Sequence, residues 1–168
     1  MSGQKEPGFA KSMMHPTYDD TLTLEEARRA FFLASGLGES GGYDERWVRI
    51  ETKPWPIYFP NTRSRVAAAR LHDLHHVATE YAADWPGEAQ IAAFELAAGC
   101  GRHYWAWFLN LGAMIVGLML FPKRTISAFR RGRHAKSLYH SGFREQDLAC
   151  VTVGMLRQSL NIEPVRKD

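Results

Sequence analysis

The sequence lacks several features that mark secreted or repeat-built proteins. It has only two cysteines, Cys100 and Cys150, which lie far apart and form no CxxC pair. We therefore expect both thiols to be reduced in an intracellular protein, without a disulfide framework. The N-terminal stretch has no apolar core of a secretory signal, so we expect a flexible tail over residues 1–20. There is no internal repeat, and a chain of 168 residues fits a single domain, which we place at 21–168.

A strong excess of one charge is also lacking. The net charge is +3, and hydrophobic residues make up 45% of the chain, enough for a buried core. One basic cluster does occur, and its members are Arg130, Arg131, Arg133 and Lys136. The simplest interpretation is a solvated face. The alternatives are contact with anionic lipid headgroups, worth about 1 kcal/mol per basic residue, or with a prenyl-phosphate-like group. Because no nucleic-acid-binding motif is present, we expect no nucleic-acid partner.

Helix signals dominate what is present. The segment TLEE at 23–26 has the form of a capping box and predicts a helix that ends near Gly36. The pair NT at 61–62 offers an N-cap for a second helix over residues 63–83. The segment DWPG at 84–87 should end that helix and start the next one, because proline suits the first turn of a helix.

The remaining segments fit the same fold class. Residues 47–62 alternate in polarity and then contain three prolines, which predicts an extended insert, either a small ribbon or a clamp over the helices. The third helix is either long or kinked at its glycines. A last helix is expected within 143–162, with three apolar residues on one face: Leu148, Val151 and Met155. The sequence therefore predicts a mostly α fold, a single-domain helical bundle with a short extended segment.

An uncharged apolar run covers residues 104–121, between basic residues on both sides. Its 18 residues are near the lower limit for crossing a bilayer. Three interpretations are open: a buried core helix, a helix that faces a membrane or a lipid groove, and a transmembrane span. The span is disfavoured because Asn110 interrupts the run and no second candidate span exists. Three glycines would permit close approach by another helix or a prenyl chain: Gly99, Gly112 and Gly117.

The most informative stretch is RLHDLHHVATEYAADWPGEAQ at 70–90. On a helix, His72 and His76 stack on one face, Asp73 borders that face, and Glu80 lies four residues beyond His76. A solvated polar face is the ordinary interpretation. However, such faces are usually rich in Lys and Glu, and two histidines four apart have the spacing with which a helix chelates a metal. Imidazole and carboxylate ligands suit both Zn²⁺ and Fe²⁺.

A single helix cannot complete such a site. The turn at 84–87 would return an antiparallel helix toward His76, and Glu88 follows that turn directly. Glu95 shares the face of Glu88 and is an alternative ligand, while Glu80 competes from the first helix. Glu88 also has a purely structural interpretation, because an acidic residue in the first turn stabilises the helix macrodipole.

The spacing of the four candidate ligands is HDxxH(x)11E, formed by His72, Asp73, His76 and Glu88. It resembles the signature of the coenzyme Q biosynthesis protein 4 family, with every position filled. The segments GEAQIAAFELAAG, RGRHAKSL and LRQSLNIEP also look like segments of that family, so the resemblance covers roughly residues 70–164. Residues 1–60 resemble it less, and Phe-Arg-Glu stands at 143–145, where family members usually have an aromatic Trp-Glu pair.

The resemblance implies an α-helical protein of ubiquinone biosynthesis whose divalent metal, Zn²⁺ by preference or else Fe²⁺, is held by those four residues. It further implies decarboxylation, with or without oxidative hydroxylation, at ring carbon one of a polyprenylated hydroxybenzoate. A divalent cation can stabilise the charge that develops as carbon dioxide leaves. Glu80 or His75 could relay a proton, although each also has an ordinary role as a supporting or surface group.

The resemblance also implies partners. We expect a polyprenylated aromatic quinone precursor, a membrane surface and other ubiquinone-biosynthesis proteins, with a homodimer as a further alternative. The expected location is cytoplasmic, peripheral on the inner face of the membrane.

Three other functions are weighed against this one. An HD-type phosphohydrolase needs an upstream helical histidine, and His15 in the tail is the only candidate. A ferritin-like di-iron protein needs two ExxH motifs, and the sequence has none. A non-catalytic lipid-binding organiser of quinone-biosynthesis enzymes, with a structural metal, is the serious alternative. A closed site of four protein ligands would favour it, because catalytic metals keep an open position.

Overall fold

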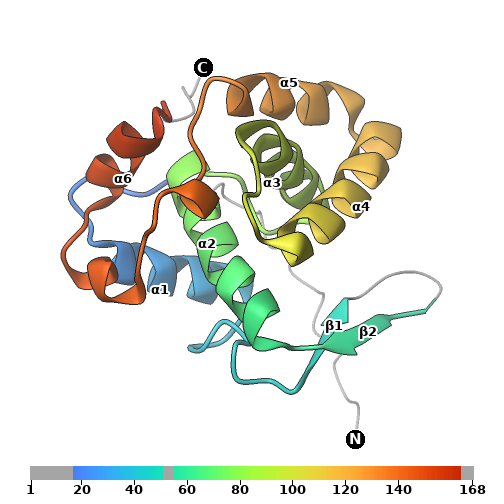
Figure 1. Ribbon diagram of the computed structural model, residues 1–168, viewed down its shortest axis with the longest axis horizontal. Helices are drawn as coiled ribbons and strands as arrows, with labels where there is room; N and C mark the ends of the chain where they lie inside the picture. Colours follow the sequence, from blue (N-terminus) through green and yellow to red (C-terminus); the bar gives the residue numbers. More distant parts are fainter. Residues whose placement is uncertain (1–16, 51–54, 164–168) are drawn as a thin grey trace, which may run out of the picture.

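The computed structural model describes residues 17–50 and 55–163, and it confirms a mostly α-helical domain. The helices are α1 (Leu24–Ser35), α2 (Arg63–Thr79), α3 (Trp85–Ala98), α4 (Tyr104–Leu120), α5 (Pro122–Gly132) and α6 (Val153–Leu160). Two short 3₁₀ helices are η1 (Leu138–His140) and η2 (Glu145–Ala149). Helix α2 lies in the middle, with α1 and α6 on one side and α3, α4 and α5 on the other (Figure 1).

The expected ribbon is present. Strands β1 (Trp47–Ile50) and β2 (Ile57–Pro60) pair antiparallel, with Trp47 opposite Pro60, and project from one end of the domain (Figure 1). Residues 51–54 of the predicted insert lie outside the described residues. Pro60 ends the second strand, which suits a residue without a backbone donor.

The first helix follows its predicted limits. The backbone amide of Glu26 donates to the Thr23 hydroxyl, and the backbone amide of Thr23 donates to the Glu26 carboxylate at 2.9 Å. Gly36 ends the helix in the left-handed region at φ 70°. The capping box and the glycine were readable because both act through local geometry.

Helix α2 ends earlier than predicted. It stops at Thr79, because Glu80 adopts the left-handed conformation at φ 63° and its amide donates to the His76 carbonyl. The prediction of helix up to residue 83 is therefore wrong. Residues 73–79 are all buried, so the polar face of this half of the helix is enclosed by protein rather than by solvent.

The third predicted helix is divided in two. Gly99 and Gly101 have φ values of 94° and 55°, and α4 begins afresh at Tyr104. The long, unbroken alternative is therefore wrong. The last predicted helix is divided as well, into η2 and α6, because the Thr152 hydroxyl accepts from the Met155 amide and starts a new helix. Met155 points outward from α6, so the predicted apolar face is wrong at that position.

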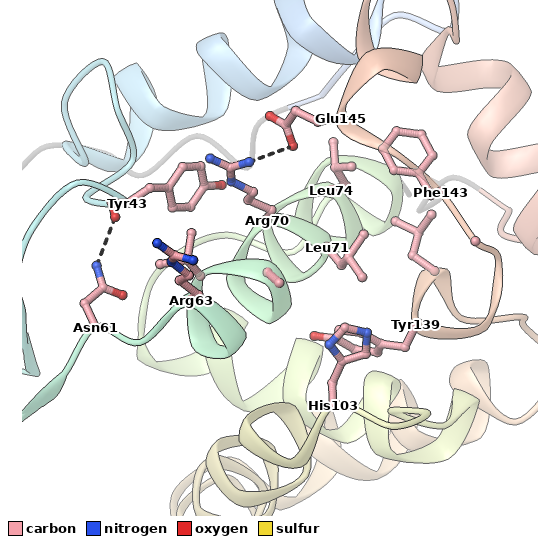
Figure 2. Close-up of a pocket in the computed structure, with 14 residues that line it drawn as sticks. Tyr43, Asn61, Arg63, Arg70, Leu71, Leu74, His103, Tyr139, Phe143 and Glu145 are labelled. Atoms are coloured by element: carbon pink, nitrogen blue, oxygen red, sulfur yellow. Dashed lines mark hydrogen bonds and ion pairs between the residues drawn. The ribbon is translucent and has the colours of Figure 1, made fainter.

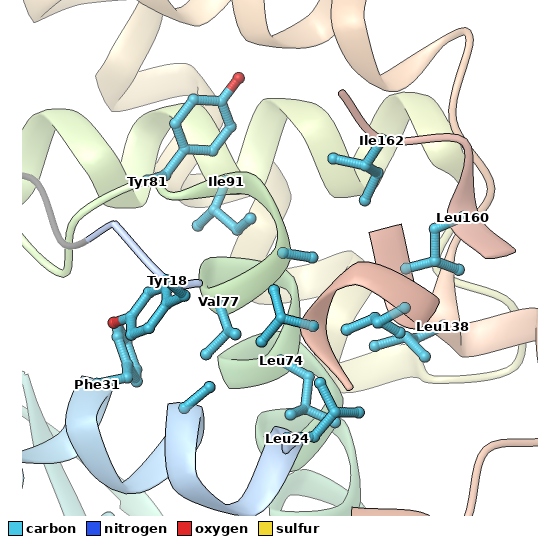
Figure 3. Packing of buried hydrophobic residues seen from close by; sticks show 14 of the residues in the cluster. Tyr18, Leu24, Phe31, Leu74, Val77, Tyr81, Ile91, Leu138, Leu160 and Ile162 are labelled. Carbon is cyan, nitrogen blue, oxygen red and sulfur yellow. The ribbon is translucent and has the colours of Figure 1, made fainter. Parts of the chain in front are cut away.

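The main core lies between α1, α2, α3, η1 and α6 (Figure 3). Phe31, Leu74, Phe94 and Leu160 are among its fully buried side chains. Tyr18 also belongs to this core, at 4% exposure. Residues 17–20 are therefore part of the folded domain rather than of the predicted tail, whose residues 1–16 lie outside the described part of the chain.

Helix α4 carries the apolar run, yet most of it is exposed. Only Ala106, Asn110 and Gly117 are buried, which makes the interpretation as a core helix wrong. Gly117 packs tightly, since a Cβ there would lie 2.5 Å from the Cβ of Ala89, whereas a Cβ at Gly112 would meet nothing within 4 Å. Within the described ranges, no helix has the length and apolar character needed to cross a membrane.

Candidate metal centre

The turn between α2 and α3 brings the candidate ligands together. Asp84 caps α3, because its carboxylate accepts from the Gly87 amide at 2.8 Å. The first turn of α3 lies so close to the preceding chain that a Cβ at Gly87 would stand 1.9 Å from the Ala82 carbonyl oxygen. Glycine therefore permits the tight return that places Glu88 beside His76 of α2.

Three side chains direct potential metal-binding atoms toward one another. The two Nε2 atoms of His72 and His76 are 3.1 Å apart, and the Glu88 carboxylate oxygens lie 3.5 Å from the first and 3.4 Å from the second. Metal bonds of about 2.0–2.1 Å at tetrahedral angles separate neighbouring ligands by about 3.3 Å. His72, His76 and Glu88 therefore form a group that could hold a metal ion, with spacings that fit a tetrahedral site.

The far nitrogen of each imidazole has a hydrogen-bond acceptor. Nδ1 of His76 donates to the Tyr81 carbonyl at 2.9 Å, and Nδ1 of His72 donates to the Glu95 carboxylate at 3.1 Å. Because carbonyl and carboxylate oxygens only accept, each Nδ1 carries the proton and each Nε2 keeps a lone pair in the neutral ring. Such supporting acceptors fix the tautomer and raise the basicity of metal-binding histidines.

Glu95 connects the group to the rest of the core. Its Oε1 accepts from His72 and His75, and its Oε2 accepts from Asn110 at 2.5 Å and Tyr139 at 3.0 Å. These four donors use all four lone pairs of a fully buried carboxylate. Burial alone would raise the pKa of Glu95, but the charge of His72 and the hydrogen bonds from both histidines hold it well below its usual range. Glu95 thus supports a ligand rather than serving as one.

One side of the group is open to solvent. The Glu88 side chain is 43% exposed and that of His72 is 23% exposed, whereas His76 is buried. Burial lowers the pKa of His72, but the charges and hydrogen bonds of Glu95 and Glu88 outweigh this and raise the pKa well above its usual value. Without a metal, the added proton of His72 belongs on Nε2, which faces Glu88 where the cation would bind.

Asp73 corrects the predicted set of four ligands. It is not a member of the three-residue group, and its carboxylate instead accepts a short hydrogen bond from the Tyr43 hydroxyl. Burial raises the pKa of Asp73, against the lowering effect of His72 and the Tyr43 hydroxyl. One residue beyond His72 on a helix, Asp73 points about 100° away from it, which explains why it faces Tyr43.

Glu80 does not extend the histidine face as predicted. The helix has already ended there, and the Glu80 carboxylate accepts from the Arg157 guanidinium at 2.8 Å and from the Tyr18 amide at 3.3 Å. Both carboxylate partners come from elements outside the metal group. The arrangement makes Glu80 a buried anchor for the N-terminal segment and α6, which corrects its candidacy as a proton relay.

His75 is also held in a structural position. The backbone amide of Leu138 donates to Nε2 of His75 at 3.0 Å, so the proton must sit on Nδ1, which donates to Glu95 at 2.7 Å. The ring is fully buried, with both nitrogens in use. His75 ties α2 to α3 and η1, and this corrects its candidacy as a relay to substrate.

The basic cluster divides into two kinds of residue. Arg131 donates to the carbonyls of Thr79 and Glu163 and stacks on Tyr81, 5.2 Å from its ring centroid, so its role is structural. The other three side chains are exposed: Arg130, Arg133 and Lys136. A contact with headgroups can therefore involve these three but not Arg131.

Sequence reasoning missed several supporting groups. The Tyr81 carbonyl and the Tyr139 hydroxyl left no trace in any pattern. Asn110 could have been found from the sequence, because a lone polar residue in an apolar run needs a hydrogen-bond partner when it is buried. Here that partner is Glu95. Glu95 itself was weighed as a ligand, and its complete set of donors shows a supporting position instead.

The described residues thus form a mostly α-helical domain with a three-residue group that could hold a metal ion. The group does not by itself identify which metal ion it would hold. Comparison of the chain with protein-family models, with characterised proteins and with solved structures finds no match.

Proposed function

We propose that the protein is a metal-dependent enzyme of ubiquinone biosynthesis. In this proposal it removes the carboxylate at ring carbon one of a polyprenylated hydroxybenzoate and replaces it with a proton, or with a hydroxyl group where dioxygen serves as the oxidant. The single observation that carries the proposal is the open three-ligand group of His72, His76 and Glu88. The complete HDxxH(x)11E spacing in the sequence supports the choice of pathway.

The number of ligands favours catalysis over a structural metal. Structural zinc sites are closed by four protein ligands, whereas catalytic sites have three and keep a position for substrate or water. Here Asp73 stays with Tyr43, and the exposed Glu88 leaves one side accessible. Zn²⁺ is the preferred ion because two imidazoles and a carboxylate at these spacings suit a tetrahedral site, and Fe²⁺ is the alternative.

The proposed chemistry needs a stabilised negative charge. A bound divalent cation would act as a Lewis acid toward the ring oxygen or carboxylate of the substrate. The bond from the ring to the carboxylate carbon breaks, its electron pair stays on the ring, and a proton from solvent on the open side replaces carbon dioxide. Glu95 holds His72 and the Tyr81 carbonyl holds His76, so neither ring needs to reorient during the reaction.

For the prenyl tail we propose α4, the helix that packs against α3. Gly117 of α4 packs against Ala89, which directly follows Glu88 in α3. The exposed face of α4, which points away from this contact, presents large apolar side chains: Phe108, Leu111, Ile115, Met119 and Leu120. Together with the three exposed basic residues of the cluster, this face supports peripheral docking on an anionic membrane, proposed here as the inner face of the cytoplasmic membrane.

Complementation tests the enzymatic proposal. His76→Ala should remove the metal and fail to restore ubiquinone synthesis in a deficient host, because a lost ligand leaves the cation under-coordinated. His134→Ala, at an exposed histidine that is not part of the metal group, is the matched control and should behave like wild type. If His76→Ala lacks metal by elemental analysis yet restores quinone, catalysis is wrong, and the role of a lipid-binding organiser of pathway enzymes replaces it.

Liposome flotation tests the docking surface. Simultaneous change of Arg130, Arg133 and Lys136 to Gln should remove about 3 kcal/mol of attraction to anionic vesicles. Arg29→Gln, at an exposed arginine of α1, is the control for a single lost charge. Binding that ignores the charge of the lipid would count against this surface.

A further inference from the structure

A cavity of about 600 Å³ lies on the other side of α2 from the metal group (Figure 2). Its α2 lining includes Arg63, Ala67, Arg70 and Leu74, which are spaced three or four residues apart and so share one helical face. At 100° per residue, that face points away from His72. Small-molecule sites are commonly about 300–1,000 Å³, so the cavity has the size of a binding site of its own.

Part of the cavity wall is apolar. Leu71 and Leu74 lie on the α2 side, and three aromatic rings also line the cavity, those of Tyr43, Phe143 and Tyr139 (Figure 2). Both tyrosine hydroxyls donate away from the cavity, Tyr43 to Asp73 and Tyr139 to Glu95. The tyrosines therefore offer ring surface to an occupant rather than free hydroxyl groups.

The charged groups at the rim leave an excess of positive charge. Two arginines, Arg63 and Arg70, face a single acid, Glu145, which Arg28 already engages at 2.7 Å. Arg70 reaches Glu145 only at 3.5 Å, and its buried Nε has no hydrogen-bond partner among the described residues. Burial and the nearby His140 lower the pKa of His103, so that ring adds no charge near neutral pH.

We propose that this cavity binds a small monocarboxylate with an apolar body. The carboxylate would pair with Arg70, with Arg63 beside it, and the body would rest on Leu71 and Leu74. One negative charge matches the excess of one positive charge among the lining residues, and the Arg70 side chain, which is 40% exposed, can pair with a carboxylate in the cavity. The site is separate from the metal group and does not depend on the proposed decarboxylation.

Titration calorimetry of the zinc-loaded full-length protein tests the proposal. The probes are 2-naphthoate for a rigid ring, dodecanoate for a chain, and neutral 2-naphthol. A charged hydrogen bond contributes about 1.5–3 kcal/mol, so Arg70→Gln should weaken naphthoate binding at least tenfold and leave naphthol binding unchanged. Arg29→Gln, at an exposed arginine of α1 that does not line the cavity, should change neither. If Arg70→Gln fails to fold, Arg63→Gln at the exposed start of α2 takes its place with the same expectation.

Two further variants separate this cavity from other places where a carboxylate could bind. Ala67→Trp fills the cavity and should abolish binding of naphthoate and naphthol alike. His76→Ala removes the metal but should leave naphthoate binding intact, even if it abolishes quinone synthesis. Tighter binding of dodecanoate than of naphthoate, with the same dependence on Arg70, identifies a fatty acid as the occupant. The proposal is overturned if naphthoate does not bind at millimolar concentration, if Ala67→Trp has no effect, or if His76→Ala abolishes binding.

Discussion

Glu95→Gln should weaken metal binding although every proposed metal ligand remains in place. The carboxylate accepts four hydrogen bonds with two oxygens, whereas an amide accepts with its oxygen and donates with its nitrogen. If the amide nitrogen faces the histidines, Nδ1 of His72 must become an acceptor. The proton of His72 then moves to Nε2 and occupies the position of the metal.

The size of this effect follows from the role of the contact. Loss of a supporting partner typically costs 10- to 100-fold in metal affinity, or about 1.4–2.7 kcal/mol. The substitution also removes a buried charge that holds four donors, so the free energy of unfolding should fall by about 3 kcal/mol. Both losses should occur without removal of any metal ligand.

The assay is competition for zinc against a chromophoric chelator, after removal of bound metal. Glu25→Gln, at an exposed acid in the first turn of α1, is the matched control and should keep wild-type affinity. Circular dichroism establishes that each variant is folded. A folded Glu95→Gln protein with zinc affinity within twofold of wild type would refute the assignment of Glu95 as the support of His72.

Three further predictions concern the turn, the protonation of the group and the buried ion pair. Gly87→Ala should lower zinc affinity at least tenfold in the same competition assay and should destabilise the protein, because the new methyl group forces the first turn of α3 away from the backbone of Ala82 and so displaces Glu88. The raised pKa of His72 means that the metal-free protein holds a proton which the unfolded chain releases near pH 6.5. The contribution of protonated His72 to the stability of the metal-free protein should therefore be complete below that pH and should be lost as the pH rises through the raised pKa. Thermal melts in the presence of a chelator measure this dependence. Zinc binding at pH 7 should release about one proton, measured by calorimetry in two buffers. Arg157→Met, which leaves Glu80 buried and unpaired, should lower the free energy of unfolding by about 3–5 kcal/mol in urea, whereas Arg157 retained with Asp20→Asn should cost less than 1 kcal/mol because Asp20 is exposed.

Local rules of sequence predicted the parts of the fold that depend on local geometry. The capping box at Thr23, the N-cap at Thr62 and the start of α3 at DWPG all act within one helical turn, and each is present. The meeting of Glu88 with the two histidines followed from the same rules, because a short break between helices returns the chain antiparallel.

The predictions for Glu80 and Asp73 are wrong because helical periodicity alone does not show which distant residues a side chain contacts. Glu80 leaves the helix because its carboxylate is held by Arg157, which is 77 residues away in sequence. The HDxxH(x)11E resemblance implies Asp73 as a ligand, but its partner is Tyr43, in a loop that no pattern connects with it. The exposure of α4 could not be predicted either, because an apolar run looks alike in a core and on a surface.

X-ray absorption at the zinc edge of the zinc-loaded, full-length protein tests the central claim most directly. The account predicts one zinc per chain, with two imidazole nitrogens and one carboxylate at about 2.0–2.1 Å and at least one oxygen from solvent. Asp73→Asn should leave that spectrum unchanged, and Glu88→Gln should change it. A site that loses an oxygen ligand in Asp73→Asn, or a site with four protein ligands and no solvent, would contradict the open three-ligand centre and the catalytic role proposed for it.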